Sequence, residues 1–382
     1  MKKPNRESDP TKLQLSLEPL RGRRAWISVT SLLILANMLV AAMMLMAGAG
    51  LWHSDNSVQM AWGANFGPAT KDGEWWRLGT AMFLHFGVLH LGMNMLALWD
   101  SGRLVERILG PGRFAILYVS SGLTGNLLSL IVQGDRAISG GASGAILGIY
   151  GAFLVFLLVE RERFHPSDFK LMFWGAAVFS ASALLLGLVV PGIDNAAHFG
   201  GLVAGAMVGF VLAPRSASSG FSRSYPRWLM SGAYVLAVVL LFANLPKPSY
   251  RWSEEQLARG EIREFLGEDA RINARLRAIL ENPPRSAASF NQMAGRIESE
   301  VVQPYEQSFE QLSALQLGPE VPSAAIVEKF RRYAEVRRDA SHALAEGIRE
   351  NNPKRIREAP DASRRATQST GKAVRPVEKP SP

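Results

Sequence analysis

Two apolar stretches of the sequence begin with side chains that could carry out nucleophilic chemistry. Ser143 stands near the start of one stretch, within Gly140–Ala145, and His198 stands near the start of another. A serine hydroxyl becomes a nucleophile when a base such as histidine lies about 2.6–3.2 Å away. The pattern therefore predicts Ser143 as a nucleophile and His198 as its general base. Asp194 is the one acidic residue close to either of them in sequence, so we expect a dyad rather than a triad.

A third apolar stretch carries His90 and Asn94, four residues apart and therefore on one face of a helix. Both side chains donate hydrogen bonds, and such side chains stabilise oxyanions in acyl-transfer sites. Ser143 would itself begin a helix, where free backbone N–H groups favour negative charge. The sequence thus predicts an oxyanion site made by His90, Asn94 and the backbone N–H of Ser143.

The helices that carry Ser143 and His198 must approach closely if the two side chains are to meet. Small residues permit such an approach between membrane helices, and both stretches contain them at helical spacing. The glycines expected to support this packing are Gly141, Gly144, Gly148 and Gly151 in one stretch and Gly201, Gly205 and Gly209 in the other.

The positioning elements are predicted to be membrane spans. Of the 382 residues, 48% are hydrophobic and 20% are charged, and apolar stretches long enough to cross a bilayer, about 20 residues each, stop after Leu245. This pattern excludes a soluble enzyme and a fibrous protein. The seven predicted spans are Trp26–Gly50, Phe83–Trp99, Phe114–Val132, Gly141–Val159, Leu171–Val190, Ala197–Ala213 and Trp228–Leu245.

Lysine and arginine residues predict the orientation, because cytoplasmic loops carry an excess of both. With the N-terminus in the cytoplasm, the inner segments hold 16 of these residues and the outer loops hold 3. The spans that carry the polar side chains then all enter from the outer face, so Ser143, His198, His90 and Asn94 lie at similar depth. We expect a bacterial inner membrane protein whose residues 246–382 lie outside the cytoplasm.

The domain organisation follows from these spans. After residue 245, apolar residues at helical spacing predict a small helical appendage, with an interruption at Pro304. The predicted parts are a cytoplasmic tail 1–25, a six-helix core 26–213, a cytoplasmic loop 214–227, a seventh membrane helix 228–245, the appendage 246–350 and a disordered tail 351–382. The chain has no cysteine, which excludes disulfides and thiolate metal sites, and its net charge of +9 does not indicate nucleic-acid binding.

Several motifs resemble those of the rhomboid intramembrane serine proteases. Gly141-Ala-Ser143-Gly144 resembles the nucleophile motif of that family, and His198-Phe-Gly-Gly201 with Gly205 resembles its histidine motif. Further similarities, in the same order along residues 26–213, are His85-x4-His90-x3-Asn94 in the second span, Trp76-Arg77 in the first outer loop and Glu106–Gly110 at the end of the second span.

The resemblance implies an all-α polytopic membrane protein with a rhomboid-like six-helix core, a seventh transmembrane helix and the helical appendage. It further implies hydrolysis of peptide bonds in or near transmembrane segments of single-span or polytopic substrates in the lipid bilayer, with no metal or cofactor. The fifth span would be a lateral gate beside the second, and residues 191–196 would cap the site. The family has an aromatic residue four positions after the serine, where this chain has Leu147; Tyr150 would partly replace it.

Two alternatives remain open at this stage. A catalytically silent relative would bind membrane proteins without cutting them, but such relatives lack the serine or the histidine. A transporter would use buried His and Asn side chains as an ion path, but it favours charged residues through the full depth of the membrane and often an inverted repeat. The appendage 246–350 could bind a substrate or partner, and Arg77 could either contact lipid headgroups or order the first outer loop.

Overall fold

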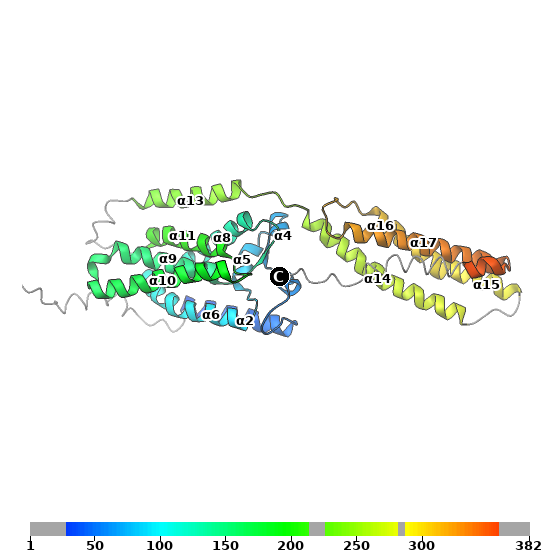
Figure 1. Ribbon diagram of the computed structural model, residues 1–382, viewed down its shortest axis with the longest axis horizontal. Coiled ribbons are helices and arrows are strands. Elements are labelled where there is room, and N and C mark those ends of the chain that lie inside the picture. The colour runs from blue at the N-terminus through cyan, green and yellow to red at the C-terminus, as the bar shows by residue number, and fades with distance from the viewer. Residues whose placement is uncertain (1–27, 214–225, 282–286, 359–382) are drawn as a thin grey trace, which may run out of the picture. The chain divides into compact units, whose positions relative to one another are not determined.

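The computed structural model describes residues 28–213, 226–281 and 287–358, and these residues are helical almost throughout (Figure 1). The chain divides into two compact units, Met1–Pro248 and Ser249–Pro382. The predicted tail 1–25, most of the predicted loop 214–227 and residues 359–382 lie outside the described residues.

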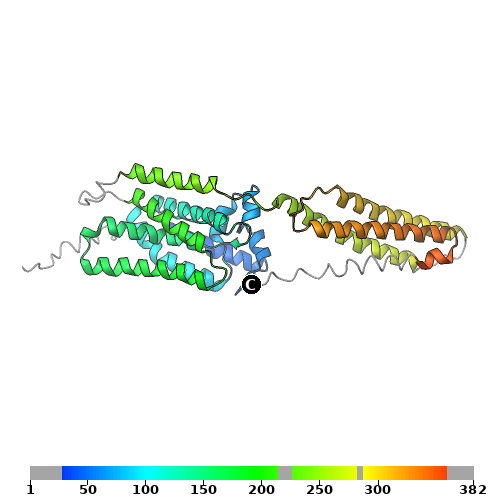
Figure 2. The same ribbon diagram turned by 45° about the horizontal axis from the view of Figure 1, so that its top comes forward.

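The first unit consists of apolar helices that pack side by side (Figure 2). Four of them are long and apolar enough to cross a membrane: α2 (Val29–Met46), α8 (Pro111–Val132), α10 (Pro166–Val189) and α11 (Asn195–Leu212). A bent pair, Arg77–Phe83 with Val88–Leu109, would be a fifth span. The chain is therefore an all-α polytopic membrane protein.

Two further apolar helices lie where the sequence predicts spans. These are α9 (Ser143–Val159) and α13 (Arg227–Ala243), each of 17 residues. At 1.5 Å per residue each is about 26 Å long, which is at the lower limit for crossing a bilayer. The seven predicted spans thus correspond to four long helices, one bent pair and two helices at that limit.

The second predicted span differs most from its prediction. The sequence places it at Phe83–Trp99, but the helix α6 (Val88–Ala97) begins only at Val88 and continues through a π-helical turn, η3 (Leu98–Gly102), into α7 (Arg103–Leu109). The segment before Val88 is held by backbone hydrogen bonds instead, from Ser54 N to Phe86 O and from Val88 N to Leu51 O. These long-range bonds are invisible in the local apolar pattern.

Glu106 joins the end of the second span to the start of α2. Its buried carboxylate accepts hydrogen bonds from Val29 N (2.7 Å), Thr30 N (2.9 Å) and Thr30 Oγ1 (2.6 Å). A carboxylate at a helix N-terminus satisfies free N–H groups and complements the helix dipole. The sequence analysis located Glu106 in a family motif but did not find this role.

We expect Glu106→Ala to lower the free energy of unfolding by about 2–3 kcal/mol, since hydrogen bonds to a charged group are lost and donors stay buried. SDS titration of the purified protein in mixed micelles would measure this change. Glu162 is exposed in the segment between α9 and α10, so Glu162→Ala is the control and should leave the midpoint unchanged. Equal midpoints for both variants would contradict the assigned role of Glu106.

The segment predicted as the first outer loop, and named so below, is folded against the core. It contains α3 (Asn56–Ala61), β1 (Asn65–Phe66), α4 (Gly67–Lys71), α5 (Arg77–Thr80) and the 3-10 turn η2 (Ala81–Phe83). Strand β1 pairs antiparallel with β2 (Ile138–Ser139), so that Asn65 faces Ser139. Because Ser139 lies four residues before Ser143, this pairing fixes the segment that leads into α9.

The second unit is a helical bundle with its own apolar core. It consists of α14 (Trp252–Leu280), α15 (Ala287–Ile297), η5 (Glu298–Val302), α16 (Gln303–Ala314) and α17 (Ala324–Arg349). The element η5 is a π-helical turn that connects α15 to α16. The predicted interruption at Pro304 takes the form of this π-helical turn, and the chain stays helical through it. The wider π-helical turn comes directly before Pro304, which then occupies the first turn of α16, where its missing N–H costs little.

The predicted disordered tail begins too early. Residues 353–358 are helical, and Ile356 packs against the core of the second unit. One isoleucine among many polar and charged residues was too weak a pattern to predict this helix from sequence. The appendage predicted for 246–350 thus extends to at least residue 358.

A buried polar network crosses the second unit. The Tyr305 hydroxyl donates to Asp269 Oδ1 (2.8 Å) and accepts from Arg337 Nε (3.0 Å), and Arg337 also donates to Asn273. Burial raises the pKa of the Tyr305 phenol well above its usual value, so the hydroxyl stays protonated and remains a donor. The network therefore links α14, α16 and α17 through one phenol.

We expect Tyr305→Phe to destabilise this unit by about 1–3 kcal/mol, because Asp269 and Arg337 each lose a buried partner. Hydrogen exchange of the whole protein, read by mass spectrometry, should show faster exchange in peptides of α14, α16 and α17. Peptides of α8, α9 and α11 serve as the internal control and should exchange as before. Unchanged exchange in all these peptides would show that the network adds no stability.

Candidate active site

The structure brings Ser143 and His198 together. Ser143 is the first residue of α9, and His198 lies in the first turn of α11. The Ser143 Oγ lies 2.8 Å from His198 Nε2, within hydrogen-bonding distance. The two helices begin side by side, so a hydroxyl and an imidazole from distant parts of the sequence meet in the geometry that nucleophilic catalysis requires.

Glycines allow this close approach of α9 and α11. A Cβ atom at Gly201 would lie 2.0 Å from the carbonyl oxygen of Gly144, and one at Gly205 would lie 2.0 Å from that of Gly148. A Cβ atom at Gly144 would lie 3.1 Å from the carbonyl oxygen of Ala197. Larger residues at Gly201 or Gly205 would push the two backbones apart and so separate the serine from the histidine.

Asp194 supports the start of α11 rather than the histidine ring. Its carboxylate accepts a hydrogen bond from Ala197 N (3.0 Å) and another from the Ser129 hydroxyl. The Nδ1 atom of His198 is buried and has no hydrogen-bond partner among the described residues. This arrangement fits a dyad, in which Asp194 caps the helix that carries the base.

Tyr150 does not stand beside the histidine as the sequence analysis expected. Its ring stacks on Phe179 of α10, with ring centroids 4.2 Å apart. Leu147 is buried in α9. The Tyr150 ring therefore joins α9 to α10 instead of supporting His198. Its position about one helical turn after Leu147 did not predict which helix the ring would contact.

His90 lies close to the segment that precedes Ser143. A Cβ atom at Gly141 would lie 3.1 Å from His90 Nε2 and 3.6 Å from Ser143 Oγ. Gly141 also has a φ of +143°, which L side chains rarely adopt, and its N–H donates to Ala81 O at 2.8 Å. Gly141 thus leaves space between a histidine donor and the serine, the space in which a substrate carbonyl would lie.

Asn94 lies one turn after His90 in α6 and is buried. Its Nδ2 donates to the backbone oxygen of His90 at 3.0 Å. An amide group has two N–H donors, so this bond uses one and fixes the direction of the other. The structure therefore places the predicted oxyanion residues on one turn of α6, next to the start of α9.

His85 is a buried residue beside the site that the sequence analysis listed only within a motif. Its ring packs edge-on against the His90 ring, with centroids 5.0 Å apart, and neither ring nitrogen has a partner among the described residues. Gln59 Nε2 donates to the backbone oxygen of His85 at 2.9 Å. His85 therefore packs against the His90 ring, and Gln59 of the first outer loop holds the backbone of His85.

Arg77 orders the first outer loop, which decides between the two roles considered for it. Its guanidinium is buried and donates to Met60 O (2.8 Å) and Ala64 O (3.1 Å), and it pairs with Glu74. It also lies over the Trp76 ring, 4.7 Å from the centroid. A buried guanidinium with these partners is not available to lipid headgroups.

Among residues 28–213, 226–281 and 287–358, no group of three or more His, Asp or Glu side chains could hold a metal ion. The candidate site itself offers a serine hydroxyl, a histidine imidazole and hydrogen-bond donors. Such a set can form and hydrolyse an acyl intermediate.

Comparison with known proteins identifies relatives of this chain. The Rhomboid domain matches residues 72–215, which include every predicted site residue. The rhomboid protease GluP of Bacillus subtilis is 36% identical over 197 residues, which are 51% of this chain and 36% of GluP. RHOMBOID-like protein 5 of Arabidopsis thaliana is 41% identical over 144 residues, which are 37% of this chain and 45% of that protein.

The matched part covers less than half the length of these two relatives. It covers more of YdcA, a rhomboid protein of Bacillus subtilis, which is 34% identical over 149 residues that make up 39% of this chain and 72% of YdcA. With its motifs, its helices and most of the length of YdcA in common, the chain belongs to the rhomboid family.

Proposed function

We propose that this protein is an intramembrane serine endopeptidase that hydrolyses peptide bonds in or near transmembrane segments of membrane proteins. The 2.8 Å contact between Ser143 Oγ and His198 Nε2, at the starts of two apolar helices, carries the proposal. The relatives that are named as rhomboid proteases support it at the level of the family.

The reaction proceeds in two steps. His198 Nε2 accepts the proton of Ser143 as Oγ attacks the carbonyl carbon of the scissile bond, and the same imidazole then protonates the leaving amine. A water molecule next attacks the acyl carbon as it transfers a proton to His198, and His198 returns this proton to Ser143 Oγ as the ester bond breaks. In both steps His90, Asn94 and the backbone N–H of Ser143 donate hydrogen bonds to the carbonyl oxygen, where negative charge develops.

Substrates reach the dyad from the bilayer, between α10 and α6, with residues 191–196 above the site. Only Ala176 and Ser180 of α10 are buried, and the Tyr150–Phe179 stack joins the middle of α10 to α9. A helix with so few buried residues moves at lower cost than α8, α9 or α11, whose buried faces are larger. This property suits a lateral gate.

The proposed location is a bacterial inner membrane, with the N-terminus in the cytoplasm and the second unit outside it. The distribution of Lys and Arg residues supports the orientation. In this arrangement the dyad lies near the outer face, and the second unit binds substrates or partners outside the cytoplasm.

Cleavage of an artificial single-span substrate in liposomes tests the proposal. We expect two products, and mass spectrometry of the new termini should place the cut in or near the membrane segment. A fluorophosphonate probe should label Ser143 in the same preparation. Labelling without cleavage would indicate a selective protease. Neither labelling nor cleavage would favour a catalytically silent relative, and transport without cleavage would favour the transporter alternative.

A further inference from the structure

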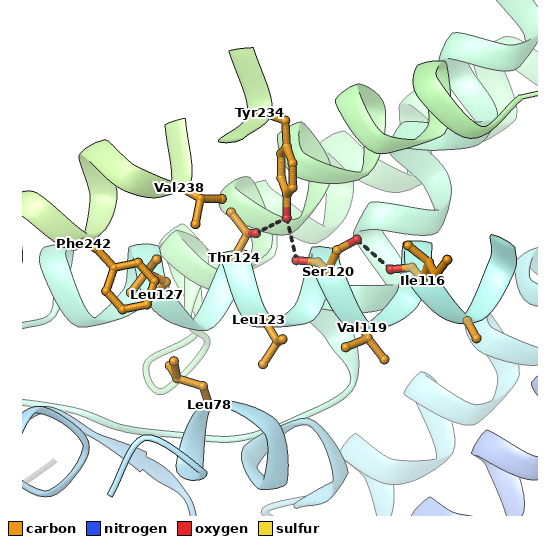
Figure 3. A pocket seen from close by; sticks show the side chains of 11 residues that line it. Leu78, Ile116, Val119, Ser120, Leu123, Thr124, Leu127, Tyr234, Val238 and Phe242 are labelled. Atoms are coloured by element: carbon orange, nitrogen blue, oxygen red, sulfur yellow. Dashed lines mark hydrogen bonds between the residues drawn. The ribbon is translucent and has the colours of Figure 1, made fainter. Parts of the chain in front are cut away.

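A cavity of about 560 Å³ lies between α8 and α13, away from the dyad (Figure 3). It is far larger than the voids of a close-packed protein interior and within the range of ligand sites. The apolar side chains that line it along the two helices are Ile116, Val119, Leu123 and Leu127 on α8 and Val238 and Phe242 on α13. We refer to this cavity as the α8–α13 groove.

The polar groups of the groove are satisfied by the protein itself. The Tyr234 hydroxyl lies 2.8 Å from Thr124 Oγ1 and bridges α13 to α8, as Figure 3 shows. The Ser120 hydroxyl donates to Ile116 O at 2.6 Å. Since these hydroxyl groups already have partners, the remaining surface of the groove offers a ligand apolar contacts.

The groove is open to the surroundings of the helices. Ile116 is 56% exposed and Val119 is 48% exposed, and none of the residues of α13 is buried. For helices that lie in a membrane these surroundings are hydrocarbon. Water would find few hydrogen-bond partners in such a space, so hydrocarbon is the medium that fills it.

The dimensions of the groove favour one acyl chain over a helix. From Ala115 to Leu127 it follows 12 residues of α8, or about 18 Å at 1.5 Å per residue, which is close to one leaflet of a hydrocarbon core about 30 Å thick. A transmembrane helix crosses both leaflets, so a groove with the length of one leaflet matches one acyl chain better than it matches a helix.

Two arginines mark the Ala115 end of the groove. Arg113 is exposed, and its Nη1 lies 3.5 Å from Leu212 O. Arg227 at the start of α13 donates to Ala213 O, the next carbonyl along the chain. Both guanidinium groups therefore meet at the C-terminus of α11, and guanidinium groups bind phosphate with particular strength.

From this combination we propose that the α8–α13 groove binds one acyl chain of an anionic phospholipid, whose phosphate lies at Arg113 and Arg227. The lipid fills the space that α13 leaves beside α8 and holds the two helices together on either side of the Tyr234–Thr124 contact. The site does not depend on the proposed peptidase activity.

The direct test uses the full-length wild-type protein in phosphatidylcholine vesicles that contain phosphatidylglycerol with a diazirine on one acyl chain. After illumination, mass spectrometry locates the labelled peptides. We expect strong labelling of peptides that span residues 115–127 and 234–242, and weaker labelling of α10, which also faces the surroundings. Equal labelling of all exposed helices would overturn the proposal without any variant being needed.

Variants separate the two parts of the proposal. Leu123→Trp fills the groove and should lower labelling there about tenfold, whereas Leu185→Trp, at a position 61% exposed on α10, should not. Arg113→Gln should lower labelling by the phosphatidylglycerol probe about fivefold relative to a matched phosphatidylcholine probe, the effect of one arginine near an anionic headgroup. Unchanged labelling in Leu123→Trp, or cross-links from the groove to a second copy of the chain, would contradict acyl-chain binding. Equal labelling of the wild-type groove by the phosphatidylglycerol and phosphatidylcholine probes would contradict the proposed preference for an anionic headgroup.

Discussion

Replacing Ser143 or His198 with alanine is expected to lower the rate of substrate cleavage by about 10⁴–10⁶-fold. The reason is that the Ser143 hydroxyl becomes a nucleophile only when His198 accepts its proton, so removal of either residue stops the same step. The double variant should therefore be no less active than either single variant, because residues that act as a unit are not additive. Initial rates of cleavage in liposomes, with equal amounts of folded protein, measure all three variants.

The chain offers matched controls for both substitutions. Ser182 is exposed on α10, and His53 is exposed in the first outer loop. Ser182→Ala and His53→Ala should cleave at the wild-type rate. If Ser143→Ala cleaved as fast as these controls, the hydroxyl at 2.8 Å from the imidazole would not be the nucleophile. If only His198→Ala remained active, another group would have to act as the base.

The sequence was most informative where a polar residue interrupts an apolar helix. Ser143, His198, His90 and Asn94 were predicted to lie at one depth because each follows the start of a span that enters from the same face. The structure places Ser143, His198 and His90 near the starts of α9, α11 and α6, with Asn94 one turn after His90 and with Ser143 and His198 in contact. Helix rise converts sequence position into depth, so the later start of α6, at Val88 instead of Phe83, changes the depth counted for His90 and Asn94.

Contacts that join distant segments could not be predicted from the sequence. The partners of Glu106 and Arg77 include backbone groups of α2 and of the first outer loop, and a backbone carbonyl or N–H has no signature of its own in the sequence. Tyr150 has the residue type expected near His198, yet it stacks on Phe179. Rotation of a helix about its axis decides such contacts, and an almost uniformly apolar helix gives no periodic pattern from which to predict its rotation.

The same reasoning explains which glycines could be identified. Gly201 and Gly205 fall at four-residue spacing in a span, which indicates a packing face. Gly141 lies in the connection before α9, where sequence alone supports only a motif. Its positive φ, and the 3.1 Å between a Cβ atom placed there and His90 Nε2, show why glycine is needed at this position. A positive φ requires a structure to be seen, whereas a repeated spacing does not.

Gly201→Ala is expected to be the most damaging substitution that leaves every polar residue of the site in place. Its Cβ atom would lie 2.0 Å from the carbonyl oxygen of Gly144, where real Cβ atoms stay beyond 3.0 Å, so α11 must move from α9 by about 1 Å. Such a shift separates His198 from Ser143, and a misplacement of that size costs about 10²-fold in rate. The overpacked contact should also cost about 3 kcal/mol of stability.

Gly232→Ala is the matched control, since Gly232 lies in the apolar helix α13 with no atom within 4 Å of the added Cβ. An alanine in an open helical position stabilises slightly, by about 0.5–1 kcal/mol. Gly201→Ala should therefore lower both the stability measured by SDS titration and the cleavage rate, whereas Gly232→Ala should raise the stability slightly and leave the cleavage rate unchanged. Because the clash is with backbone, no side-chain rotation can relieve it; full activity of Gly201→Ala would mean that the contact between α9 and α11 does not set the distance between the serine and the histidine.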